Sequence, residues 1–223
     1  MSPIIVVLKK DLTILFFKKK GIIEALLLGL IIIFTFSLAS SNLEVVHPVW
    51  SGTIFWVCSL FCCVLIFREL YRIEERDNVF ELLIIAPISK EGIWISKTIA
   101  GFIATLFLQI FFLILMVIFL KIDLTKSLLY SFISILLIDL GICIMGSFFG
   151  GAMAGTHLKD SLLTTILFPL EIPLVLGGIK IYTQLISGGT FDEISGWIRI
   201  IIGYDAIFAG ICLFLYPYIL GDS

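Results

Sequence analysis

The stretch FIATLFLQIFFLILMVIFL, at residues 102–120, indicates the fold class, because it holds no charged residue and a single strongly polar one, Gln109. An α-helix needs roughly 20 predominantly apolar residues to cross about 30 Å of bilayer hydrocarbon. The stretch, extended back to residue 98, therefore predicts a transmembrane helix. Five other stretches meet the same criterion, and the predicted spans are residues 21–40, 50–67, 98–120, 128–152, 162–181 and 197–220.

The composition of the chain agrees with this prediction. Of its 223 residues, 60% are hydrophobic and only 14% are charged, whereas a soluble domain carries about 25% charged residues. The net charge of −2 does not indicate a nucleic-acid partner. We expect an all-α integral membrane protein with about six transmembrane helices, formed by a single transmembrane domain over residues 1–223.

The distribution of Lys and Arg predicts the orientation, since cytoplasmic loops carry an excess of these residues. With the N-terminus inside, 11 of the 15 basic residues lie on the cytoplasmic side. The other four are Lys121, Lys126, Lys180 and Arg199. We therefore expect both termini in the cytoplasm.

Residues 1–20 precede the first span, and residues 4–20 have the pattern of an amphipathic helix. Its apolar face consists of Ile5, Leu8, Leu12, Leu15 and Phe16, and its polar face of Lys9, Lys10, Thr13 and Lys20. Such a helix lies in the membrane interface, with its lysines toward anionic head groups. An N-terminal extension of the first span is the alternative, but the lysine run at residues 18–20 favours a break.

The connection between the second and third spans, residues 68–97, is expected to form a pair of short cytoplasmic helices. Arg68, Arg72 and Arg76 share one helical stripe, and the apolar run LLIIA at residues 82–86 is ended by Pro87. Proline disfavours helix at the residue before it, so the two helices should meet there. A solvated charged helix is the alternative, but an apolar run outside the membrane needs the bilayer or a partner protein to bury against.

Small residues and prolines mark the fourth and fifth spans. Small residues four apart let helix backbones approach closely in lipid, and two such pairs are present: Gly146 with Gly150, and Gly151 with Gly155. We favour packing within one subunit over a subunit interface, which would make a homodimer. Pro169 and Pro173 lie about one turn apart and predict a bent fifth span that faces protein, because the freed backbone groups need partners.

Asp139 and Glu171 are acidic residues that fall inside predicted spans. Intramembrane acids are costly and often functional, although a structural hydrogen-bond role is the reading we favour for each. The five cysteines lie in apolar runs, and no His/Cys cluster has metal-ligand spacing. The chain also lacks a GxxxxGK[ST] phosphate loop. We therefore expect no catalytic, cofactor or metal site in this chain, and no enzyme activity.

Two stretches resemble the membrane permease family of the cytochrome c maturation system, the haem exporter permeases, within the ABC-2 class of transporters. They are ERDNVFELLIIAPISKEGIWISK, which begins at residue 75, and GSFFGGAMAGTHLKDSLLTTILFPLEIPLVLGG, which begins at residue 146. The resemblance covers essentially the whole chain. Asn78 departs from the family pattern, where glycine is expected, although asparagine also tolerates a left-handed turn.

The resemblance implies a multi-pass permease in the bacterial cytoplasmic (inner) membrane that works with a separate cytoplasmic ABC ATPase subunit. It also implies further cytochrome c maturation membrane subunits, a haem chaperone, and a docking role for residues 68–97. The side chains expected to contact the ATPase are Glu75, Asp77, Phe80, Glu81, Leu83 and Pro87. The function implied is coupling of ATP hydrolysis to haem export or to release of a haem-loaded chaperone.

Haem itself has no convincing ligand set in this sequence. The two histidines, His47 and His157, fall on opposite sides of the predicted membrane and cannot ligate one haem together. Haem is therefore expected as a substrate of the complex rather than a cofactor of this chain. The rival readings are an ABC-2 permease for a lipid, polysaccharide or drug, a membrane enzyme, and a structural scaffold.

Overall fold

The computed structural model describes residues 3–18, 20–40, 46–76, 86–122, 128–153 and 159–219, and within them it contains helices and turns but no strand. A short π-helical turn, Ile14–Lys18, follows the first helix. The α-helices are α1 (Pro3–Thr13), α2 (Lys20–Ala39), α3 (Pro48–Arg76), α5 (Lys90–Leu120), α6 (Leu128–Met153), α7 (Lys159–Ile186) and α8 (Phe191–Ile219).

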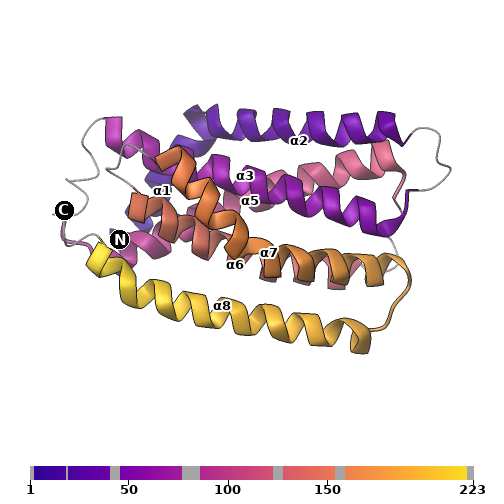
Figure 1. Cartoon of the computed structure of the whole chain (residues 1–223). Coiled ribbons are helices and arrows are strands. Elements are labelled where there is room, and N and C mark those ends of the chain that lie inside the picture. The colour runs from indigo at the N-terminus through magenta and orange to yellow at the C-terminus, as the bar shows by residue number, and fades with distance from the viewer. Residues whose placement is uncertain are drawn as a thin grey trace.

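Six of these helices are long and apolar enough to cross a membrane, which confirms the predicted fold class. They lie side by side in one bundle, and α1 begins at the same end of the bundle at which α8 finishes (Figure 1). α5 has 31 residues and is therefore about 46 Å long. This exceeds the roughly 30 Å of bilayer hydrocarbon, so one end of α5 reaches beyond it.

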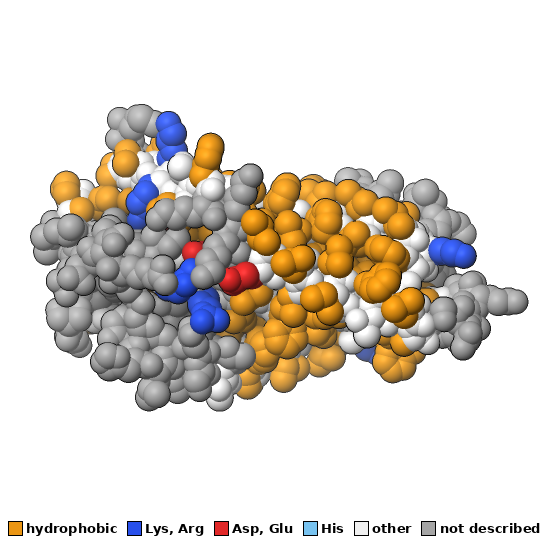
Figure 2. Space-filling model, turned by 90° about the horizontal axis from the view of Figure 1, so that it is seen from above, with side chains coloured by type: hydrophobic (Ala, Val, Ile, Leu, Met, Phe, Trp, Pro, Cys, Tyr) orange, Lys and Arg blue, Asp and Glu red, His pale blue; other side chains and the backbone are white. Residues whose placement is uncertain are grey.

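The centre of the bundle is α3, which packs against α2, α5, α6 and α7. Its side chains Phe55, Trp56 and Phe67 are almost completely buried. By contrast, α2 presents large apolar side chains such as Leu27 and Ile31 on the surface. Hydrophobic side chains gather over α2, with Lys and Arg toward the ends of the molecule (Figure 2). This is the arrangement of a bundle whose surrounding solvent is hydrocarbon.

Of residues 68–97, where a pair of short helices is predicted, the structure describes 68–76 and 86–97, so the helix pair itself stays a prediction. Residues 68–76 continue α3, and α5 already begins at Lys90. Pro87 lies in a bend just before α5, where Ser89 is the N-cap and its hydroxyl accepts a hydrogen bond from the Gly92 N–H at 3.1 Å. Residues 68–76 and 90–97 belong to long helices because each of these stretches extends a spanning helix that is already formed and packed.

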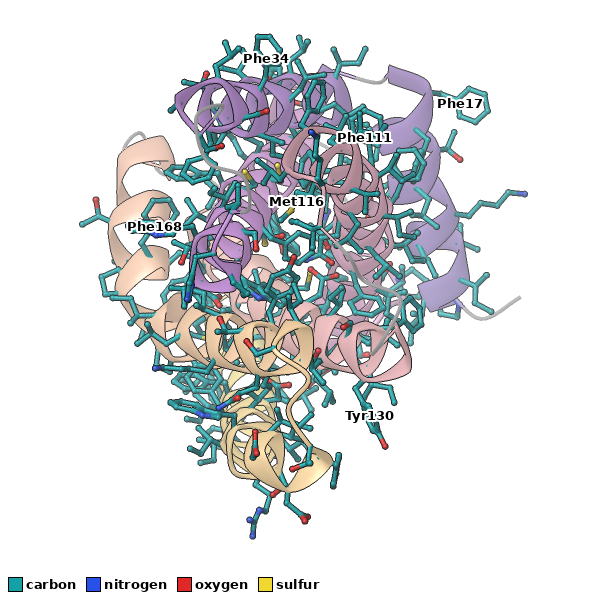
Figure 3. The ribbon with its side chains drawn as sticks, turned by 90° about the vertical axis from the view of Figure 1, so that its right-hand side faces the viewer. Phe17, Phe34, Phe111, Met116, Tyr130 and Phe168 are labelled. Carbon is teal, nitrogen blue, oxygen red and sulfur yellow. The ribbon has the colours of Figure 1, made fainter. Side chains whose placement is uncertain are left out.

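The N-terminal segment is helical as expected, and the stripe that packs most deeply against the bundle coincides only in part with the predicted apolar face. Val7, Asp11 and Leu15 are buried, while Ile5 is about half exposed. Three other members of the predicted apolar face, Leu8, Leu12 and Phe16, are partly buried against the main core. A shallow open groove runs along this segment, lined by Ile5, Leu8, Lys9, Leu12, Thr13, Phe16 and Phe17. Phe17 points away from the bundle (Figure 3). Ile5 and Phe17 are the large apolar side chains of this groove that are exposed.

Candidate functional site

A polar contact between α5 and α6 lies inside the membrane-spanning core. Asp139 is 1% exposed, and its carboxylate accepts hydrogen bonds from Thr105 Oγ1 at 2.9 Å and Gln109 Nε2 at 3.3 Å. The Cys143 thiol lies one turn along α6 and also contacts the Thr105 hydroxyl, at 3.4 Å. Gln109, the one strongly polar residue of the third span, therefore supplies a hydrogen-bond donor to the buried Asp139 carboxylate.

Glu171 on α7 has a different environment. Its side chain is 0% exposed, yet neither carboxylate oxygen has a hydrogen-bond partner among the described residues. It interacts electrostatically with Asp205 on α8 and with Asp139 on α6. Asp205 is 7% exposed, and both of its carboxylate oxygens also lack partners there. Three acids from α6, α7 and α8 are therefore buried, and of these only Asp139 has a hydrogen-bond partner among the described residues.

Helix α7 contains both predicted prolines, Pro169 and Pro173, in its interior. The ribbon of α7 bends partway along its length (Figure 1), and its first part lies at the side of the bundle near Phe168 (Figure 3). Proline removes a backbone donor and kinks a helix at that point. The Tyr204 hydroxyl of α8 donates to the Leu170 carbonyl at 2.6 Å, so α8 contacts α7 between the prolines.

The glycines of α6 allow aromatic side chains to lie directly on the helix backbone. A Cβ at Gly146 would meet Phe67 Cδ2 at 2.5 Å, and one at Gly150 would meet the Tyr71 ring at the same distance. Gly151 lies against Tyr216 of α8 in the same way. These contacts are within one subunit. Gly155 lies outside the described residues.

Tyr71 joins several helices near the end of α3. Its hydroxyl lies 2.7 Å from the Ser147 carbonyl of α6, to which it donates, and 3.3 Å from the Tyr216 hydroxyl of α8. The Lys97 ammonium of α5 lies 4.6 Å from the centre of the Tyr71 ring. Lys97 is also 3.6 Å from Asp11 of α1, as a fully buried ion pair. This cluster, which we call the Tyr71 hub, ties together α1, α3, α5, α6 and α8.

A second contact at this end joins the start of α5 to the end of α8. The Lys90 ammonium donates to the Pro217 carbonyl at 3.2 Å. A cation at a helix C-terminus satisfies a free carbonyl and complements the helix dipole. Lys90 is the first residue of α5, so this hydrogen bond joins the start of α5 to the last turn of α8.

The predicted coupling residues are only partly described. Pro87 is exposed, and Glu75 belongs to α3, although its side chain is not described. Asp77, Phe80, Glu81 and Leu83 lie outside the described residues. Their docking role therefore stays a prediction.

The histidines and cysteines form no shared site in the described part of the chain. His47 lies just before α3, and its Nδ1 accepts a hydrogen bond from the Val49 N–H at 3.3 Å. His157 lies outside the described residues. The five cysteines are buried and free, and the described residues contain no group of three His, Cys, Asp or Glu that could hold a metal ion.

Sequence reasoning missed Asp205 and the Asp11–Lys97 pair. Asp205 carried a usable signal, since it is an acid inside the predicted sixth span, the criterion that identified Asp139 and Glu171. Lys97 was counted only as a charge that sets orientation. No local pattern in the sequence places it against Asp11, which is 86 residues away in the chain (97 minus 11).

The fold and these contacts define a polytopic α-helical membrane protein with several polar residues buried in its hydrophobic core. A family model described as CcmB protein matches residues 3–220, so the chain belongs to the CcmB family. This is the family of the membrane permease of the cytochrome c maturation haem exporter, which confirms the resemblance seen in the sequence. No curated protein and no solved structure matches the chain.

Proposed function

We propose that this chain is the membrane permease of an ATP-driven complex in the bacterial inner membrane, with both termini in the cytoplasm. It couples ATP hydrolysis by a separate cytoplasmic ABC ATPase to haem export or to release of a haem-loaded chaperone. The observation that carries the proposal is the family match over residues 3–220. Its partners are the ATPase, other cytochrome c maturation membrane subunits and the haem chaperone.

The geometry supports a simple coupling route. The segment between α3 and α5 is the proposed contact with the ATPase, through Glu75, Asp77, Phe80, Glu81, Leu83 and Pro87. Helix α3 is the centre of the bundle, and the Tyr71 hub connects its end to α1, α5, α6 and α8. Displacement of this one segment therefore reaches all these helices through contacts that are short and buried.

Co-purification with the ATPase tests this function. Phe80→Ala with Leu83→Ala removes two large side chains, each of which contributes roughly 1.5–3 kcal/mol when fully buried in a partner cleft. The affinity for the ATPase should fall on the order of a hundredfold or more, at about 1.4 kcal/mol per decade. Glu81→Lys should weaken docking in a salt-dependent manner.

Phe17→Ala is the matched control, because Phe17 is a large side chain that is 81% exposed. It should leave ATPase recovery unchanged, and neither variant alters a spanning segment. Full recovery of the ATPase with the double variant, together with altered membrane behaviour, would show that the apolar run lies on lipid. Failure of any ATPase to co-purify with a functional wild-type chain would overturn the permease function itself.

A further inference from the structure

The acids in the core differ in a way that the proposed permease function does not explain. Asp139 has two hydrogen-bond donors from α5, whereas Glu171 and Asp205 have none among the described residues. An ionised carboxylate in a low-dielectric interior, without donors or a counter-charge, is far costlier than a neutral carboxyl. Such groups are retained in membranes mainly where they take part in function.

The surroundings of Glu171 supply no positive charge among the described residues. Helix α7 packs against α3, α6 and α8. The titratable groups on those helices that interact electrostatically with Glu171 are Cys63, Asp139, Tyr204 and Asp205. Each of these groups becomes negative when it ionises. The salt bridges in the described part of the chain join other residues, namely Lys10 and Lys97 to Asp11, and Arg72 to Glu69.

The Asp205 side chain packs against α6 at Gly141, a residue that has no side chain. A Cβ at Gly141 would clash with the Asp205 carboxylate oxygen and with Leu174 of α7. The Asp205 carboxyl therefore lies directly on the α6 backbone, next to α7. It is also the more exposed of the two acids, at 7% against 0% for Glu171. Of the two acids, Asp205 is therefore the one whose carboxyl is nearer to the outside of the bundle.

We propose that Glu171 and Asp205 form a proton-binding site in the membrane core, loaded through Asp205 and exchanging its proton with water when α7 and α8 repack. A proton is the ligand that fits, because Glu171 is fully enclosed and the described residues offer no metal-binding group. Binding of a proton neutralises the buried carboxylate. Release of the proton requires that the carboxylate gain water or a hydrogen-bond donor. The protonation state is therefore linked to the contact between α7 and α8.

Infrared spectroscopy of the purified full-length chain in lipid nanodiscs tests the site directly. A protonated carboxyl has a carbonyl stretch that an ionised one lacks. The wild type should show this band near neutral pH and lose it reversibly as the pH rises, over about pH 5 to pH 9, a range in which buried carboxyl groups titrate. Glu171→Gln and Asp205→Asn should each remove part of the titrating band.

Glu193→Gln is the matched control, because Glu193 is an exposed acid in the first turn of α8. It should leave the protonated-carboxyl band unchanged. Labelling of the wild type with a hydrophobic carbodiimide, which reacts with protonated carboxyls, gives a second readout that needs no variant. Mass mapping should find the label on Glu171 or Asp205, and less of it at high pH.

Two results would overturn the proposal. In the first, neither Glu171→Gln nor Asp205→Asn diminishes a protonated-carboxyl band of the wild type, and carbodiimide labels neither acid. The other is a band that belongs to these acids but does not change with pH, which would make them permanently neutral packing groups. The measurements use this chain alone, so a failed ATPase interaction would not affect their outcome.

Discussion

Gly146 shows how a single residue determines the packing between α3 and α6. Its missing side chain lets Phe67 lie on the α6 backbone, where a Cβ would be 2.5 Å from Phe67 Cδ2. Phe67 is fully buried in the main hydrophobic core, so it has no free space to move into. The GxxxG pattern therefore serves an aromatic contact within the subunit at this position, rather than a backbone-to-backbone contact with another copy.

Gly146→Ala should lower the stability of the protein in lipid or mild detergent. Overpacking a tight core costs about 1–3 kcal/mol, which outweighs the gain of up to about 1 kcal/mol from replacing glycine in a helix. Gly203→Ala is the control, since its Cβ would have no neighbour within 4 Å. It should be neutral or stabilising. Equal unfolding midpoints for the two variants would contradict the packing described here.

At the scale of an element, α1 and the π-helical turn combine a buried polar residue with an exposed apolar one. Asp11 anchors one stripe to Lys97 inside the bundle, while Phe17 is 81% exposed. A polar residue on the buried side and an apolar residue on the open side reverse the pattern of a soluble helix. The reversal follows if the open side faces hydrocarbon and the buried side faces a charged partner.

An environment-sensitive fluorophore attached to Phe17→Cys should be quenched by lipids with brominated acyl chains. The same fluorophore on Lys9→Cys, which is exposed on α1, should be quenched much less, because lysine faces the head groups. Labelling is selective because the five native cysteines are buried. Equal quenching at both positions would place this segment away from the membrane interface.

At the scale of the whole molecule, an even number of spanning helices puts the start of α1 and the end of α8 at one end of the bundle (Figure 1). The Lys90–Pro217 hydrogen bond and the Tyr71 hub lie at this end too, as do the end of α3 and the start of α5. The described ion pair between Lys97 and Asp11 and the Lys90 hydrogen bond thus lie at the end of the bundle that the proposed topology places in the cytoplasm. The opposite end carries the short turn between α7 and α8.

Orientation can be tested with a membrane-impermeant thiol reagent on spheroplasts. Asp192→Cys, at the exposed start of α8, should react in intact spheroplasts. Lys9→Cys should react only after permeabilisation, because the charge distribution places it inside. The reverse pattern would invert the proposed topology while leaving the six-helix bundle unchanged.

The sequence alone determined the number and approximate positions of the spans, because crossing hydrocarbon is a local requirement. Each helix must satisfy its own backbone hydrogen bonds and be apolar over roughly 20 residues. Pro87 as a helix boundary and the prolines inside α7 were readable for the same reason, since their effect is on the adjacent backbone. The family resemblance was also contained in the order of such local features.

Only the tertiary structure decided which polar residues have partners. Asp139 and Glu171 look equivalent in sequence, yet Thr105 and Gln109 on α5 reach the first and no described donor reaches the second. Lys97 meets Asp11, and Asp205 meets Gly141, only because distant helices are packed side by side. Hydrogen bonds and ion pairs act over a few ångströms in space, so partners far apart in the chain leave no local pattern.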